Sequence, residues 1–293
     1  MTEIRIMAAR HSVFYSPLIS LIAGGFLENE GLTGSYHLCP SGISITKEVV
    51  SERMDVSQAA VSSSWIDLEK GEKPSIAQFA QINTLDGFFI AAREADSHFT
   101  WDKLKGSKLM YVHGGQPEAM LRYGANRKGV DLDEVYGINK PSTQDMMNSW
   151  RRGEGDYFHE QGSYPQQLEL EGCAHIVASV GEAVGPVAFS SLICRWEWLE
   201  TEDAKRFSDA YRASREWVDT ADPEEIAKTE ADFFPDHAVE SITDAVRAYQ
   251  QMGTWRGDIA IPKDLYESAL DVFEHSNLIS QRHAYEKVVV PPP

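Results

Sequence analysis

The chain has 293 residues with 45 acidic and 27 basic side chains, which gives a formal net charge of −18 at neutral pH. This acidic excess argues against binding to nucleic acid or to anionic membrane surfaces, because both need basic patches. The apolar and charged fractions, 42% and 25%, are typical of globular proteins, and the length allows two lobes.

Short apolar segments alternate with helical patterns through most of the chain, which predicts βα units and a largely parallel sheet. We expect strands at Ile4–Ala9, Tyr36–Cys39, Val56–Ala60, Phe88–Arg93, Lys108–Val112, Asp156–His159, His175–Ser179 and Phe189–Cys194. We expect helices at Pro17–Glu30, Ile43–Glu52, Ser62–Lys70 and Pro117–Lys128. After Trp196 only helical spacing remains, and Asp222-Pro223 is typical of a helix start. The last valines and prolines predict an extended strap.

The segment Lys108–Val112 is followed by His113-Gly114-Gly115-Gln116, with Pro117 where a helix should begin. Free backbone N–H groups at such a helix start suit a carboxylate, sulfonate, phosphate or polar heterocycle. The spacing matches neither a P-loop nor a dinucleotide-binding loop. An ordinary strand-to-helix turn without a ligand is the alternative.

Two segments near the N-terminus, Phe14–Leu18 and Ala23–Leu32, resemble the opening of the type 2 periplasmic binding proteins. The resemblance is to the branch that binds nitrate, alkanesulfonates, taurine and thiamine-pyrimidine precursors for ABC importers. Residues 54–58, 99–108 and 150–156 continue it in the same order. It implies an α/β, two-lobed fold with a ligand cleft between the lobes and a helical C-terminal segment. Residues 1–90 and 190–293 would form lobe 1, and residues 91–189 would form lobe 2.

Five strand ends are expected to converge on the cleft, where open α/β sheets place their ligands. The expected ligand-binding residues are His11, Ser12, Tyr15, Gln58, Ser62, Ser63, His113, Gly114, Gly115, Gln116, Tyr157, His159, Glu160, Gln161 and Glu182. Packing of Tyr15 under the first helix and helix capping by the serines are the structural alternatives. Glu160 is expected to pair with a cationic or N–H-rich ligand. The histidines lack metal-binding spacing, so we expect no metal and no cofactor.

We expect a solute-binding protein that captures a small polar or heteroaromatic ligand, such as a sulfonate, a carboxylate or a thiamine-pyrimidine-like molecule. The resemblance implies an ABC transporter permease as the partner. The alternative is a cytoplasmic enzyme on the same fold, related to desulfinases or thiamine-pyrimidine synthases. The cysteine cluster of the synthases is missing from Val180–Cys194. The desulfinase nucleophile position falls on Ser12, which would need a base to become nucleophilic. A sensor or carrier without a transporter is a third candidate.

Residues Met1–Ala8 lack the basic and long apolar regions of a secretory leader. No apolar run is long enough to cross a bilayer, so no membrane insertion is expected. As the sequence stands we expect a cytoplasmic protein, or a periplasmic one if a leader has been removed.

Overall fold

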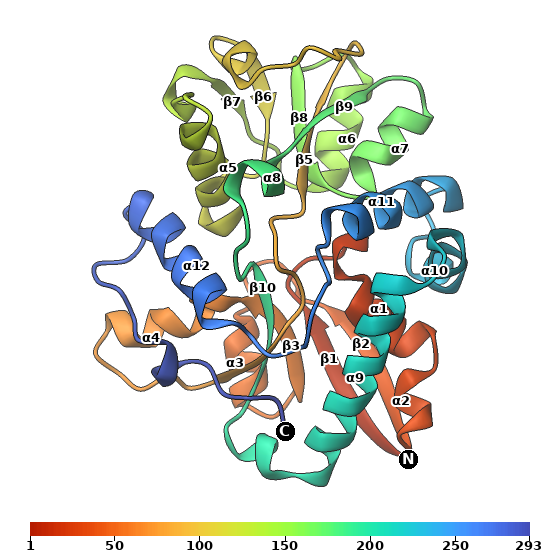
Figure 1. Cartoon of the computed structure of the whole chain (residues 1–293), viewed down its shortest axis with the longest axis vertical. Coiled ribbons are helices and arrows are strands. Elements are labelled where there is room, and N and C mark those ends of the chain that lie inside the picture. Colours follow the sequence, from red (N-terminus) through yellow and green to blue (C-terminus); the bar gives the residue numbers. More distant parts are fainter.

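Two five-stranded sheets, each flanked by helices, make up the computed structural model, which describes residues 1–293 (Figure 1). The first sheet has the strand order β2-β1-β3-β10-β4. Its strands are β1 (Thr2–Ala8), β2 (Leu32–Leu38), β3 (Val56–Ala60), β4 (Ala77–Gln81) and β10 (Ser190–Cys194). β1 runs parallel to β2 and β3, whereas β10 is antiparallel to β3 and β4.

The second sheet has the order β7-β6-β8-β5-β9 and repeats this plan. Its strands are β5 (Phe88–Ala92), β6 (Lys108–Met110), β7 (Tyr136–Ile138), β8 (Tyr157–Gln161) and β9 (His175–Ser179). β6 is parallel to β7 and β8, and β5 is antiparallel to β8 and β9. The sheets are therefore mixed, because in each one the strand that arrives from the other lobe runs antiparallel. The lobe boundary expected at residue 90 falls within β5.

Helices of the first part of the chain connect the strands of each sheet. They are α1 (Ser16–Ala23), α2 (Phe26–Asn29), α3 (Ile45–Val50) and α4 (Trp65–Glu69) around the first sheet, and α5 (Gly115–Arg127), α6 (Thr143–Arg151), α7 (Tyr164–Leu170) and α8 (Val180–Val184) around the second. The sequence did not indicate β4 and β7. Gln78 and Gln81 interrupt the apolar pattern of β4, and β7 is short and largely exposed.

The chain passes between the sheets twice, through residues 82–87 and 180–189 (Figure 1). The two crossings touch, because a Cβ added at Gly181 would lie 2.3 Å from the backbone oxygen of Asp86. Only glycine fits at that position. Asp86 is fully buried, its Oδ1 accepts from the backbone N–H of Phe88 at 2.7 Å, and burial raises its pKa to about 8.

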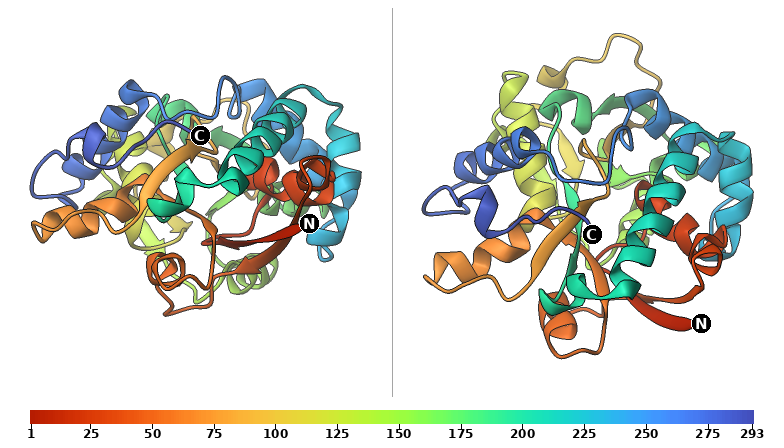
Figure 2. Two further views of the ribbon diagram at one scale, coloured as in Figure 1. Left: turned by 90° about the horizontal axis from the view of Figure 1, so that it is seen from below. Right: turned by 60° about the horizontal axis from the view of Figure 1, so that its bottom comes forward.

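The C-terminal segment is helical and consists of α9 (Glu202–Thr220), α10 (Pro223–Glu230), α11 (Val239–Met252) and α12 (Lys263–His275). Asp222 caps α10 by accepting from the backbone N–H of Glu224, as its sequence predicts. The last residues extend beside β4, where Gln78 pairs with Val289, and the chain ends next to the first sheet (Figure 2).

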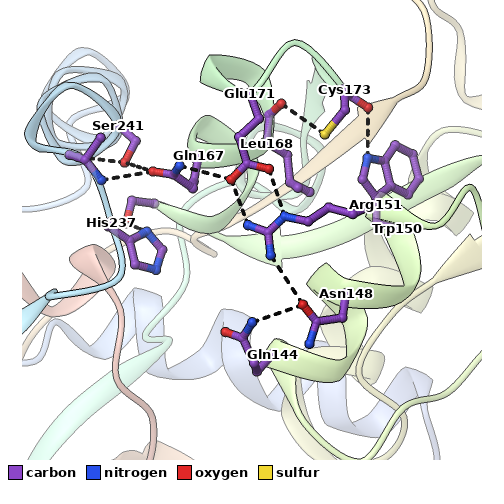
Figure 3. Close-up of polar contacts among 12 residues, drawn as sticks. Gln144, Asn148, Trp150, Arg151, Gln167, Leu168, Glu171, Cys173, His237 and Ser241 are labelled. Atoms are coloured by element: carbon purple, nitrogen blue, oxygen red, sulfur yellow. Dashed lines mark hydrogen bonds and ion pairs between the residues drawn. The ribbon is translucent and has the colours of Figure 1, made fainter.

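This segment is not confined to the first lobe, where we expected it. α9 packs on α1 and α2, whereas α11 packs on α7 and α12 on α5. Figure 3 shows Gln167 of α7 facing Ser241 of α11, and the Gln167 amide oxygen accepts from the Ser241 hydroxyl and from the backbone N–H of Ala238, both at 3.0 Å. Gln167 is itself held by Glu171, which forms an ion pair with Arg151. The tail therefore joins the two lobes by a route other than the crossings.

Glu230 at the end of α10 is a buried carboxyl group that packs against α1. It accepts hydrogen bonds from the hydroxyls of Ser16 and Ser20 and has no cation beside it. Burial raises its pKa to about 8. The folded protein therefore holds this proton more tightly than the unfolded chain does.

We predict that the contribution of Glu230 to the free energy of unfolding falls as the pH rises from about 4.5 to about 8, because only the unfolded state releases the Glu230 proton in this window. Relative to the wild type, Glu230→Gln should gain stability by up to about 1.4 kcal/mol per pH unit. Denaturant titrations at several pH values measure this difference, with exposed Glu225→Gln as the control. A constant difference between Glu230→Gln and wild type across this range would contradict the assignment.

Candidate functional site

An ion pair joins the ends of β1 and β8, one strand from each sheet. Nη2 of Arg10 lies 2.5 Å from Oε1 of Glu160. The Glu160 side chain is completely buried, and 26% of the Arg10 side chain is exposed. Burial disfavours the charged form of Arg10, but Glu160 outweighs this effect and the pKa of Arg10 is raised. Glu160 also accepts from the hydroxyl of Thr143 at 3.0 Å and from the backbone N–H of Gln161 at 2.9 Å.

A second set of polar contacts lies beside this pair. The hydroxyl of Ser12 donates to Oε1 of Gln161 at 2.9 Å, and Nε2 of Gln161 donates to the hydroxyl of Tyr15 at 3.2 Å. Oε1 of Gln58 accepts from the backbone N–H groups of Ala9 and Arg10. The structure thus brings together Ser12, Tyr15, Gln58, Glu160 and Gln161, all of them expected site residues. Their polar groups are bonded to other groups of the protein, and together they form a buried polar layer between the lobes.

His159 lies in the same region but contributes no charge. Its ring stacks on Phe88 with 4.5 Å between centroids, and neither ring nitrogen has a hydrogen-bond partner. Burial, followed by the nearby Arg10, lowers its pKa to about 3. His159 is therefore neutral at physiological pH. It faces the opposite side of the sheet from Glu160, because adjacent residues of a strand alternate.

A cavity of about 360 Å³ opens where β3, α5 and α12 meet. It is lined by Ala60, Ser62, Ser63, Trp65, Ile66, Glu69, Gly115, Gln116, Phe273, Leu278 and Ile279. Four of the expected site residues, from the two different lobes, therefore share one cavity: Ser62 and Ser63 on one side, Gly115 and Gln116 on the other. Its volume is within the range of small-molecule sites. Leu278 and Ile279 of the segment after α12 complete its wall.

Gln116 connects the cavity with the crossing at Phe189. Its Nε2 donates to the backbone oxygen of Phe189 at 2.7 Å, which fixes the orientation of the amide. Its Oε1 is left without a hydrogen-bond partner, although only 7% of the residue is exposed. A buried carbonyl without a donor is costly, so this atom would gain from a ligand's donor if movement of the lobes brings the two together.

The backbone conformation of the turn at Gly114 and Gly115 explains why both positions are glycine. Gly114 has φ 81° and ψ 162°, a region open essentially to glycine alone, and Gly115 has φ 62°. No atom lies within 4 Å of a Cβ built at Gly114, so crowding is not the reason. The helix begins at Gly115, two residues before Pro117. The backbone N–H of Gly114 donates to the carboxylate of Glu118 at 2.6 Å.

Four other expected site residues neither line the cavity nor take part in the hydrogen bonds of the polar layer. His11 bonds through its ring to the hydroxyl of Tyr36 and the backbone oxygen of Phe233. His113 stacks on Tyr111. The other two are Tyr157, at the opposite end of β8 against Phe99, and Glu182, exposed on α8.

Arg10 is a site residue that our sequence analysis missed. It is the first charged residue after the apolar strand β1, in the turn that leads to Ser12. That position at a strand's carboxyl end was the available signal.

No catalytic pair is assembled around Ser12. Its hydroxyl donates to an amide oxygen, and His11 points to other partners. Glu160 is engaged by Arg10 and has no hydrogen bond to His159. Nor does the chain contain a group of three or more His, Cys, Asp or Glu side chains placed to hold a metal ion.

A larger hollow, of about 700 Å³, lies elsewhere, between the loop around Gly71–Pro74 and the C-terminal strap. Trp196, Gln281 and Lys287 complete its lining. It receives no residue from the second sheet. The smaller cavity is the better candidate because strand ends of both sheets meet there.

We predict that Arg10→Met destabilises the protein by about 3–5 kcal/mol, because it leaves Glu160 buried without its cation. The double variant Arg10→Met/Glu160→Gln should recover at least half of that loss. Arg53→Met, which breaks the surface pair with Glu48, serves as the control and should leave the stability close to that of the wild type. Chemical denaturation of the wild type, these three variants and the single variant Glu160→Gln measures these values. Equal effects of the two arginine variants, or simple additivity at the Arg10–Glu160 pair, would show that the ion pair does not hold the lobes.

Comparison with known proteins agrees with this architecture. No family model matches the chain. A curated relative, "Putative binding protein YtlA" of Bacillus subtilis (strain 168), is 25% identical over 99% of this chain and 88% of its own length. No helix is long and apolar enough to cross a membrane.

Solved structures share the fold at lower identity. The ligand-binding component of an ABC-type import system from Staphylococcus aureus, solved with zinc bound, matches at a TM-score of 0.78 and 14% identity over 99% of this chain and 97% of that one. The alkanesulfonate-binding protein SsuA of Xanthomonas axonopodis pv. citri, bound to MOPS, matches at 0.75 and 13% over 99% of each chain. The desulfurization enzyme DSZB matches at 0.68 and 11% over 99% and 97%. The chain thus has the two-lobed periplasmic-binding-protein-like fold, as its sequence predicts.

Proposed function

We propose that this protein reversibly binds a small molecule in the cavity between its two lobes. The observation that carries the proposal is the cavity itself, in which Ser62 and Ser63 face the Gly115-Gln116 turn from the other sheet. Gln116 is one of its lining residues and carries a buried carbonyl without a hydrogen-bond partner. A binding cavity of this kind needs a few placed polar groups in a mainly apolar wall.

The ligand class that the fold and the residues support is a small polar or heteroaromatic molecule. Trp65 and Phe273 supply aromatic surface to the cavity, and the serine hydroxyls supply hydrogen-bonding groups. Entry and release would require the lobes to move on the two crossings, residues 82–87 and 180–189. In the closed arrangement the Arg10–Glu160 pair stabilises contact between the lobes.

We further propose an ABC transporter permease as the partner. The support is the Staphylococcus aureus neighbour, which is named as a component of an ABC-type import system. A transporter that binds only the ligand-bound arrangement of the lobes would contact both lobes at once. For such a partner the protein would work outside the cytoplasm.

The enzyme alternative has less support from the geometry. DSZB shows that the fold can host an enzyme. Here the Ser12 hydroxyl donates a hydrogen bond to the amide oxygen of Gln161. No base lies within hydrogen-bond distance of the Ser12 oxygen to activate it as a nucleophile. Turnover of the bound molecule that is abolished by Ser12→Ala or His159→Ala would favour the alternative over reversible binding.

We predict that the purified protein retains a small molecule from cell extract in a one-to-one ratio, identified by mass spectrometry after denaturation. Ser62→Phe should abolish this retention by filling the cavity, while the protein remains folded. Ser51→Phe, on the exposed end of α3, should retain the molecule as the wild type does. Retention by Ser62→Phe, or release of a chemically altered molecule, would contradict reversible binding in this cavity.

A further inference from the structure

The charges around the cavity between the lobes restrict what it can bind. No lysine or arginine lines it, and its one charged lining residue is Glu69. The Glu69 carboxylate accepts from Nε2 of His283 at 2.6 Å and from the backbone N–H of Ser280. An anion in this cavity would therefore meet a carboxylate and no cation.

The turn that could have bound an anion is already occupied by the protein's own carboxylate. Glu118 accepts from the backbone N–H of Gly114 at the start of α5. Its neighbour Arg122 contacts Glu118 at 3.3 Å and Asp133 at 2.8 Å, with Asp131 at 3.9 Å. One guanidinium thus faces three carboxylates. A further negative charge at this helix start would add repulsion.

The Arg10 guanidinium between the lobes is also neutralised. Arg10 is paired with Glu160, and Asp86 and His159 in the same region are uncharged near neutral pH. The region between the lobes therefore carries no net positive charge for an anion. The glycine turn alone would suit an anionic ligand, but the charges around it do not.

Gln116 adds a positive requirement. Its amide nitrogen is committed to the backbone oxygen of Phe189, so the amide cannot rotate without placing two oxygens against each other. Its free carbonyl oxygen can only accept a hydrogen bond. A ligand that brings an N–H or O–H group to that atom as the lobes close on it would satisfy the carbonyl.

We infer that the cavity selects a compact, uncharged molecule with an apolar body and an N–H or O–H group that donates to Oε1 of Gln116, and that it rejects anions of the same shape. The inference rests on the proposed function and narrows its ligand class. Its apolar body would lie against the side chains of Trp65, Phe273 and Ile279. Sulfonates and carboxylates are thereby excluded.

Three matched probes test the inference on the full chain by calorimetry: benzamide, methyl benzoate and benzoate. All three carry the same phenyl ring. Benzamide adds an uncharged hydrogen-bond donor, methyl benzoate an uncharged group without a donor, and benzoate an anionic group. We expect benzamide to bind most tightly and benzoate most weakly. Gln116→Leu should weaken benzamide about five- to tenfold, the value of one neutral hydrogen bond, and leave methyl benzoate unchanged. Gln144→Leu, on the exposed face of α6, is the matched control and should bind all three as the wild type does.

Benzoate binding as tightly as benzamide would overturn the inference. So would an unchanged benzamide affinity in Gln116→Leu, or no benzamide binding at about 10 mM. The identity of the molecule retained from cell extract shows whether only the charge selection has failed or the proposed binding function has failed as well. A retained anion would refute the charge selection while the binding function stands, whereas retention of no molecule would refute the function itself.

Discussion

The ion pair between Arg10 and Glu160 is the contact on which the arrangement of the two lobes depends. It joins residues 150 positions apart in the sequence, at the ends of one strand from each sheet. Breaking one side of a buried pair leaves a charge that the interior cannot solvate. The hydrogen bonds of Gln161 with the hydroxyls of Ser12 and Tyr15 likewise form only while the strand ends of the two sheets meet. The pair also neutralises the arginine between the lobes that an anionic ligand could have used.

The tail gives the lobes a second connection. α12 contacts the first lobe through Trp65, which stacks edge-on with Phe273 and donates to the hydroxyl of Tyr266. The same helix reaches α5 of the second lobe, where His275 packs on Tyr123. Since residues after α12 also line the cavity, movement of the lobes and access to the cavity involve the same segment. This coupling follows from packing and requires no separate lid.

Much of the fold could be predicted from the sequence, because apolar strands, helix starts and the segment order are local patterns. The alternation of strands and helices and the helical C-terminal part were indicated in this way, whereas the two lobes were implied by the resemblance to a known family. The expected residues Ser62, Ser63, Gly115 and Gln116 lie together around one cavity, and their contact with a ligand stays a prediction. The ion pair between the lobes could not be predicted from the sequence, because no local pattern around Arg10 indicates that Glu160 is its partner. Glu160 was expected to hold a ligand, but in the structure it holds Arg10. The buried protonated carboxyl of Glu230 is equally invisible in the sequence, because burial raises its pKa only after the helices have packed.

A crystal structure of the protein with the molecule that it retains from cell extract would test the central claim most directly. We predict ligand density in the cavity between the lobes, in contact with Ser62, Gly115 and Gln116, with the Arg10–Glu160 pair intact. Density confined to the hollow beside Trp196 and Lys287, with the cavity between the lobes empty, would contradict this account.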